Sequence, residues 1–114
     1  MKSNKLHNIY KKLPSAKGNE IFDKIIQKSG VKIERITSFG QATPTGKWLK
    51  SKRNEWVILL KGEAKLQFRL SKNVIEMKPG DYMFIPAGTM HRVEWTTPKG
   101  KSVWVAVMFR EQGK

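Results

Sequence analysis

From Val31 onward, turn-forming residues divide the chain into short apolar segments. They are Gly40, Gly46, Gly62, Asn73, Pro79-Gly80, Pro86, Gly88 and Pro98-Lys99-Gly100. Short apolar segments separated by turn residues at regular intervals are typical of an all-β sandwich or barrel. We therefore predict strands over Val31–Ser38, Lys47–Lys50, Glu55–Lys61, Ala64–Leu70, Val74–Met77, Tyr82–Ile85, His91–Thr96 and Ser102–Phe109.

The part of the chain before Val31 follows a different pattern. Residues 1–18 carry five lysines and no acidic residue and contain Pro14 and Gly18, which predicts a basic N-terminal arm. Residues 19–29 have an amphipathic pattern with helical spacing, and Gly30 follows as a helix stop, so we predict a short helix there, covering an end or edge of the sheet. Residues 19–114 would then form one domain that includes this helix.

The composition excludes several classes of protein. The chain has 114 residues and no cysteine, so neither a disulfide framework nor a thiolate metal site or cysteine nucleophile is available. No apolar run approaches the ~20 residues that a membrane helix needs, and residues 1–15 lack the apolar middle of a signal peptide. We expect a cytoplasmic protein without a membrane partner.

The net charge of +14 arises from 23 Lys and Arg residues against 9 Asp and Glu residues. Such an excess attracts phosphates and nucleic acids. The basic residues are spread along the predicted strands, often at alternate positions as in Lys65 and Arg69, which favours a solvated basic surface. A nucleic-acid partner is therefore the less favoured interpretation.

The stretch Gly80–His91 holds the single histidine beyond the basic arm and has the pattern G-x5-P-x-G-x2-H. This pattern resembles the second motif of the cupin family. Glu55 and Gly62 match the end of the family's first motif at its spacing, and the resemblance extends over about residues 45–109. It implies a double-stranded β-helix, also called a jelly-roll or cupin barrel.

The resemblance also bears on metal binding. In metal-bearing cupins, three histidines and the glutamate of the first motif hold an iron, manganese, nickel or zinc ion. Counting back from Glu55 places Trp48 and Lys50 where two of these histidines would be if the longer gap of the motif is used, and Leu49 and Ser51 if the shorter gap is used, so only Glu55 and His91 match. Since a catalytic ion of this type needs about three protein ligands, we predict no cofactor. A divalent transition metal held by Glu55 and His91 is the alternative.

Strand alternation predicts which other side chains share the barrel interior with Glu55 and His91. Trp95 lies four residues after His91 in the same predicted strand and should therefore lie on the same face, and Trp48 and Lys50 share one face for the same reason. We expect the ammonium of Lys50 to pair with the buried Glu55 carboxylate, because a buried charge without a partner is costly. The predicted ligand-binding residues are Trp48, Lys50, Arg53, Arg92 and Trp95.

Two kinds of function are compatible with this site. The favoured one is binding of a small anionic or polar molecule, with a ring stacked on Trp48 or Trp95 and an anionic group bound by Lys50, Arg53 or Arg92. The alternative is a metal-independent isomerase, epimerase or lyase in which the catalytic groups Glu55 and His91 transfer protons. A metal-dependent cupin enzyme with an atypical site is a further possibility, so catalysis is left undecided.

Two predicted strands are apolar at both odd and even positions, Glu55–Leu60 and Val103–Phe109. Strands of this kind are normally covered on both faces. Since an uncovered face would form a large apolar patch, we expect the N-terminal helix or a second subunit to cover it, and we predict a homodimer.

Overall fold

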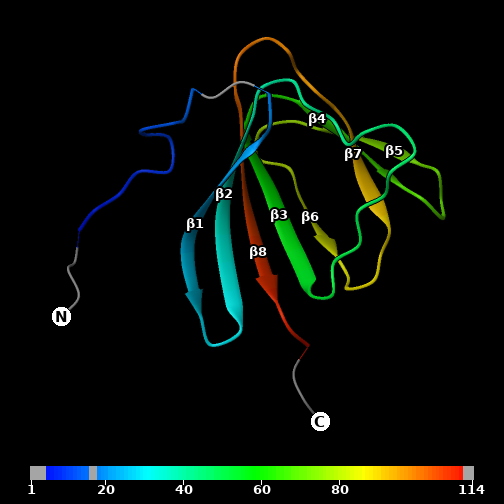
Figure 1. Ribbon diagram of the computed structural model, residues 1–114, viewed down its shortest axis with the longest axis horizontal. Coiled ribbons are helices and arrows are strands. Elements are labelled where there is room, and N and C mark those ends of the chain that lie inside the picture. The colour runs from blue at the N-terminus through cyan, green and yellow to red at the C-terminus, as the bar shows by residue number, and fades with distance from the viewer. Residues whose placement is uncertain (1–4, 16–17, 112–114) are drawn as a thin grey trace.

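The computed structural model describes residues 5–15 and 18–111, which form eight strands in two antiparallel sheets (Figure 1). The strands are β1 (Ile21–Lys28), β2 (Val31–Ser38), β3 (Asn54–Lys61), β4 (Ala64–Phe68), β5 (Val74–Met77), β6 (Tyr82–Ile85), β7 (His91–Thr96) and β8 (Ser102–Phe109). The all-β prediction is confirmed. Seven of the eight predicted segments are strands, whereas Lys47–Lys50 contributes one isolated bridge, between Leu49 and His91.

The larger sheet has the strand order β1-β2-β8-β3-β6, and the smaller sheet has the order β5-β4-β7. In Figure 1 the five strands of the larger sheet lie side by side, and the smaller sheet lies at their right. The hydrophobic core lies between the sheets. It joins Val57, Leu59, Trp104 and Ala106 of the larger sheet to Leu66 of β4, all of them buried.

The predicted helix over residues 19–29 is wrong, because this segment forms β1 and pairs along its length with β2. Ser29 and Gly30 connect the two strands with φ values of 51° and 81°, as in the two-residue turns that suit the twist of a hairpin. A β-bulge between Lys24 and Ile26 shifts the alternation by one residue. The apolar side chains on either side of the bulge therefore recur at a spacing that imitates a helix.

The turn between β3 and β4 requires glycine. Gly62 has a φ of 92°, and a Cβ atom at this position would lie 2.8 Å from the Cα atom of Ser102 at the start of β8. Any other residue would combine backbone strain with a steric clash. The conformation of this motif glycine thus brings the β3–β4 turn against β8.

Arg35 of β2 attaches the N-terminal arm to the larger sheet. Its Nη1 atom donates hydrogen bonds to the carbonyl oxygens of Ile9 (3.1 Å) and Lys11 (2.8 Å), and its Nη2 atom pairs with Asp23 of β1 at 2.8 Å. One guanidinium group therefore links the arm, β1 and β2.

Among the described residues, no helix is long and apolar enough to cross a membrane.

Candidate functional site

A cavity of about 330 Å³ lies between the inner faces of the two sheets. Its walls come from β1, β2, β3, β8 and the end of β6 on one side, from β4 and β7 on the other, and from the loop that joins β2 to β3. The polar side chains in its lining are those of Glu20, Glu34, Lys50, Ser51, Glu55 and His91. The structure therefore brings together both predicted catalytic residues and one of the five predicted ligand-binding residues.

Glu55 reaches the cavity because it alternates with Trp56 and shares the inner face of β3 with Val57 and Leu59, which are buried. Burial raises the pKa of its carboxyl above the usual range, since the charged form loses hydration. The nearby His91 opposes this rise in pKa and Glu34 adds to it. None of the described residues forms an ion pair or hydrogen bond with the Glu55 carboxylate.

His91 is the first residue of β7 and is only 6% exposed. Its Nδ1 atom lies 3.0 Å from the carbonyl oxygen of Thr89, which can only accept a hydrogen bond, so Nδ1 carries the proton. The neutral ring then has its lone pair on Nε2. This nitrogen has no protein partner among the hydrogen bonds of the described residues and is available to a ligand in the cavity.

The loop between β2 and β3 carries Lys50 and Ser51 to the cavity. It is held by backbone hydrogen bonds between Leu49 and His91 in both directions, at 2.6 and 3.0 Å, and from the Gly88 amide to the Ser51 carbonyl oxygen at 2.8 Å. The expected ion pair between Lys50 and Glu55 is not one of the three ion pairs that the described residues form. Lys50 lines the same cavity as Glu55 without being bound to it.

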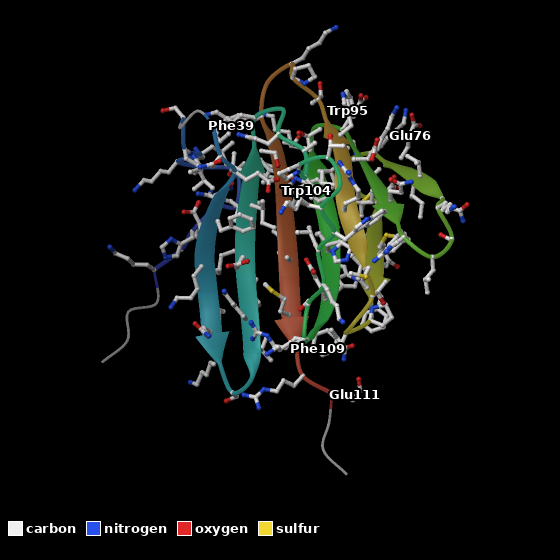
Figure 2. All side chains as sticks on the ribbon, turned by 45° about the vertical axis from the view of Figure 1, so that its right-hand side comes forward. Phe39, Glu76, Trp95, Trp104, Phe109 and Glu111 are labelled. Atoms are coloured by element: carbon white, nitrogen blue, oxygen red, sulfur yellow. The ribbon has the colours of Figure 1, made fainter. Side chains whose placement is uncertain are left out.

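Trp95 lies outside the cavity because a β-bulge interrupts β7. Leu66 of β4 pairs with Val93, but its neighbour Lys65 pairs with Trp95, so Glu94 is an extra residue. The expected alternation therefore fails after Val93, and Trp95 turns to the outer face of the small sheet, where the Lys65 ammonium lies 5.4 Å from its ring centre. Figure 2 shows Trp95 at the upper rim of the molecule, whereas Trp104 lies near its middle.

The other three predicted ligand-binding residues also lie outside the cavity lining. Arg92 is directed to the loop, where its Nη2 atom donates a hydrogen bond to the Thr43 carbonyl oxygen at 2.6 Å, and its Nε atom lies 3.4 Å from Glu94. Trp48 and Arg53 are half-buried residues of the same loop. A ligand confined to the cavity would not meet these three side chains.

Sequence reasoning missed Glu20, Glu34 and Trp104. The Trp104 indole donates a hydrogen bond to the Ser38 hydroxyl at 3.1 Å, and this hydroxyl donates to the Glu20 carboxylate at 2.7 Å. Glu34 pairs with Lys32 at 3.0 Å. Glu34 could have been found from its parity with Ile36 in the predicted strand Val31–Ser38, but Glu20 could not, because its place depends on β1.

The residues present do not fit the metal site of metal-bearing cupins. Within residues 5–15 and 18–111, no three His, Cys, Asp or Glu side chains are grouped so that they could hold a metal ion. Trp48 lies outside the cavity lining, and the Lys50 ammonium is a poor metal ligand because it has no free lone pair. The absence of a cofactor, expected from the sequence, stays a prediction.

The chain is similar to a crystal structure from Ralstonia eutropha JMP134 that is named as a candidate mannose-6-phosphate isomerase. The TM-score is 0.89 at 37% sequence identity, and the match covers 94% of this chain and 99% of the Ralstonia eutropha chain. A cupin superfamily protein from Desulfitobacterium hafniense DCB-2 has a TM-score of 0.71 at 16% identity, covering 87% and 84% of the two chains. A conserved Streptococcus pyogenes protein of unknown function has a TM-score of 0.74 at 14% identity, covering 99% and 93%. The latter two show likeness of fold alone. Comparison with curated protein sequences gives no match.

The model of the family described as "Cupin domain" matches residues 38–108, which include both motif segments and most of the cavity wall. The match covers more than half of the chain and agrees with the two-sheet architecture. The chain therefore belongs to the cupin family.

Proposed function

We propose that this cupin binds a small polar molecule in the cavity between its two sheets. The observation that carries the proposal is the convergence of Glu55, His91 and Lys50, which come from separate parts of the chain, on one cavity of about 330 Å³. This volume lies at the small end of the range for ligand sites, roughly 300–1,000 Å³. Apolar walls with a few convergent polar groups are the usual composition of such sites.

The apolar walls would enclose the body of the ligand, and the polar groups would determine its orientation. Leu66, Trp104 and Met108 supply apolar surface from both sheets. His91 Nε2 and the Glu55 carboxylate can accept hydrogen bonds, and the Lys50 ammonium can donate them. An anionic ligand would meet Lys50 as the only Lys or Arg of the described residues in the lining.

A ligand screen with a blocked cavity tests this proposal. Amines, polyols, carboxylic acids and sugar phosphates are screened for an increase in melting temperature, since a ligand that binds the folded state stabilises it. Val93→Phe, which fills the cavity from β7, should abolish the increase, and the matched control Val74→Phe on exposed β5 should retain it.

If Val93→Phe does not fold, Leu49→Trp serves the same purpose, because Leu49 lines the cavity but is 44% exposed and tolerates a larger side chain. A ligand that binds the blocked variants as tightly as the wild type would place the binding site elsewhere and refute the proposal.

Metal-independent proton transfer, as in an isomerase, epimerase or lyase, is the second candidate function. It is favoured by the presence in one cavity of a carboxyl whose pKa is raised by burial and a histidine whose Nε2 atom has no hydrogen-bond partner among the described residues. Neutral His91 would remove a proton from a C–H or O–H group of the ligand, and protonated Glu55 would donate one. The name of the Ralstonia eutropha relative refers to an isomerase, which supports this candidate.

Isotope exchange separates catalysis from binding. A bound ligand whose acidic C–H group exchanges in D₂O only with the protein present, as followed by NMR, would establish proton transfer. Glu55→Gln and His91→Asn should lower the exchange rate by at least ~100-fold, a typical contribution of a general acid or base, while Glu76→Gln on exposed β5 should not. Full exchange in both site variants would contradict this assignment.

The homodimer expected from the sequence is proposed to form through the outer face of the larger sheet. Trp56, Tyr82, Phe84 and Phe109 form an aromatic cluster there, with Tyr82 and Phe84 65% and 52% exposed. An aromatic cluster of this kind favours a protein contact. Light scattering coupled to size exclusion should give twice the chain mass of 13.1 kDa. A monomer at micromolar concentration would refute the proposal.

A further inference from the structure

We propose that the cavity prefers a small organic cation, a protonated amine on an apolar body, over phosphorylated or carboxylated ligands. This inference rests on the proposed ligand-binding function. It identifies the charge class of the ligand, which neither the family nor the fold decides.

The charged residues in the cavity lining are mostly acidic, whereas those of the whole chain are mostly basic. The chain has 23 Lys and Arg residues and 9 Asp and Glu residues. Among the described residues, Lys50 is the only Lys or Arg in the lining, whereas three glutamates, Glu20, Glu34 and Glu55, belong to it. A strongly basic protein has therefore placed a third of its acidic residues around one cavity of about 330 Å³.

Two of the three carboxylates already have partners. Glu20 accepts a hydrogen bond from Ser38 at 2.7 Å, and Glu34 pairs with Lys32 at 3.0 Å, with only 13% of its side chain exposed. The described residues offer no such partner to Glu55. A largely buried carboxylate without a partner is costly, and a cationic ligand group beside it would offset that cost.

His91 adds a second acceptor on the opposite sheet. It is 6% exposed, and its Nδ1–H donates to Thr89, so the Nε2 atom that is left for the cavity can only accept when the ring is neutral. An ammonium group has three N–H donors and no acceptor. It can therefore satisfy Glu55 and His91 together, whereas a carboxylate or phosphate offers both of them further acceptors.

A phosphorylated sugar, the class of molecule in the name of the Ralstonia eutropha relative, would carry close to two negative charges into this site. It would meet Lys50 as its one cationic partner from the described Lys and Arg residues, and it would face Glu34 and Glu55. Like charges repel more strongly in a partly buried site than in bulk water. The arginines that could have reversed this balance, Arg53 and Arg92, do not line the cavity.

Three probes with one apolar body test the charge preference: cyclohexylamine, cyclohexanol and cyclohexanecarboxylate, with mannose 6-phosphate as a fourth probe. Titration calorimetry at neutral pH keeps the amine protonated, because alkylamines such as the Lys side chain have a pKa of about 10.4. The amine should bind at least ~10-fold more tightly than the alcohol, and both anions should bind more weakly than the alcohol.

The Glu55→Gln variant tests the cause of that order. It keeps the shape of the side chain and removes its charge, so it should reduce the advantage of the amine over the alcohol by at least ~10-fold and change the affinity for the alcohol by less than ~3-fold. Glu76→Gln, an exposed glutamate on β5 outside the cavity, is the matched control and should leave the order unchanged.

The outcomes distinguish this inference from the proposed function. If an anion binds most tightly and Val93→Phe abolishes that binding, the cavity is a ligand site but the cation preference is refuted. The inference is also refuted if the amine keeps its full advantage in Glu55→Gln. If no probe and no compound of the wider screen binds in a way that the cavity-filling variants abolish, the proposed function fails together with the inference.

Discussion

The two faces of the larger sheet carry opposite chemistry although they are built from the same strands. The inner face of β2, β3 and β8 presents Glu34, Glu55 and Trp104 to a cavity between the sheets. The outer face of β3 and β6 presents Trp56, Tyr82 and Phe84, with few polar groups between them. A strand that is apolar at nearly every position thus borders a cavity on one side and an exposed aromatic cluster on the other, which is the basis for proposing a ligand site on the first side and a protein contact on the second.

The largest effect is expected from truncations on the two faces of β3. Leu59→Ala removes a side chain that is fully buried between the sheets, and should lower the free energy of unfolding by about 2–5 kcal/mol. Ile58→Ala, on the outer face, should cost less in a monomer because Ile58 is only half-buried.

Urea denaturation at several protein concentrations sharpens this comparison. If a second copy covers the outer face, the loss in free energy of unfolding caused by Ile58→Ala should grow with protein concentration. The loss caused by Leu59→Ala should stay constant, because the burial of the inner face does not change on dimerisation. A loss for Ile58→Ala that is the same at all concentrations would contradict the proposed difference between the faces.

Phe84→Lys tests the outer face directly. A charged residue in the centre of an aromatic cluster should weaken the proposed dimer by about 2 kcal/mol or more, roughly a 30-fold change in its dissociation constant. Sedimentation equilibrium measures this change. Val74→Lys, at another exposed apolar position outside the cluster, is the control and should leave the dimer intact. Ligand binding in the cavity should survive both substitutions.

Glu55→Gln should change how the stability of the protein depends on pH. Because burial raises the pKa of Glu55, the folded state binds its proton more tightly than the unfolded state does, so stability falls as pH rises from the usual glutamate range through the raised pKa. Glu55→Gln should therefore be more stable than the wild type at pH 8, and the difference should disappear at a pH below the usual glutamate range.

Urea denaturation at both pH values measures this difference. Glu76→Gln, whose exposed carboxylate stays hydrated, should show no comparable gain at pH 8. A wild type that gains stability relative to Glu55→Gln as pH rises would mean that a cation, such as Lys50, pairs with Glu55 in solution.

The smallest effect is expected at Arg35, on the outer side of β2. Arg35→Lys keeps the charge but cannot reproduce hydrogen bonds to three carbonyl oxygens and one carboxylate, which require the forked guanidinium. The free energy of unfolding should fall by about 1 kcal/mol, and amide hydrogen exchange in residues 5–15 should accelerate. Arg53→Lys, in the loop between β2 and β3, is the control and should leave exchange in this arm unchanged.

Much of the fold could be predicted because its signals are local. Seven strands follow from the turn residues that bound them, and Gly62 and His91 follow from motifs with defined spacing. Two of the failures occur where β-bulges change the parity of a strand. One makes β1 resemble a helix, and the other moves Trp95 from the expected interior to the outer face.

The sequence by itself determined most of the strands and turns, because these depend on alternation and backbone preferences of neighbouring residues. That Glu55 and His91 share one barrel was implied by the resemblance of their motifs to those of cupins. Only the tertiary structure decided that Lys50 reaches the cavity while Arg53 and Arg92 do not, and that Glu20 and Glu34 join Glu55 there. These placements depend on the bridge between Leu49 and His91 and on the pairing of β1 with β2. Contacts between distant segments, which local spacing does not specify, therefore determine the charge of the cavity.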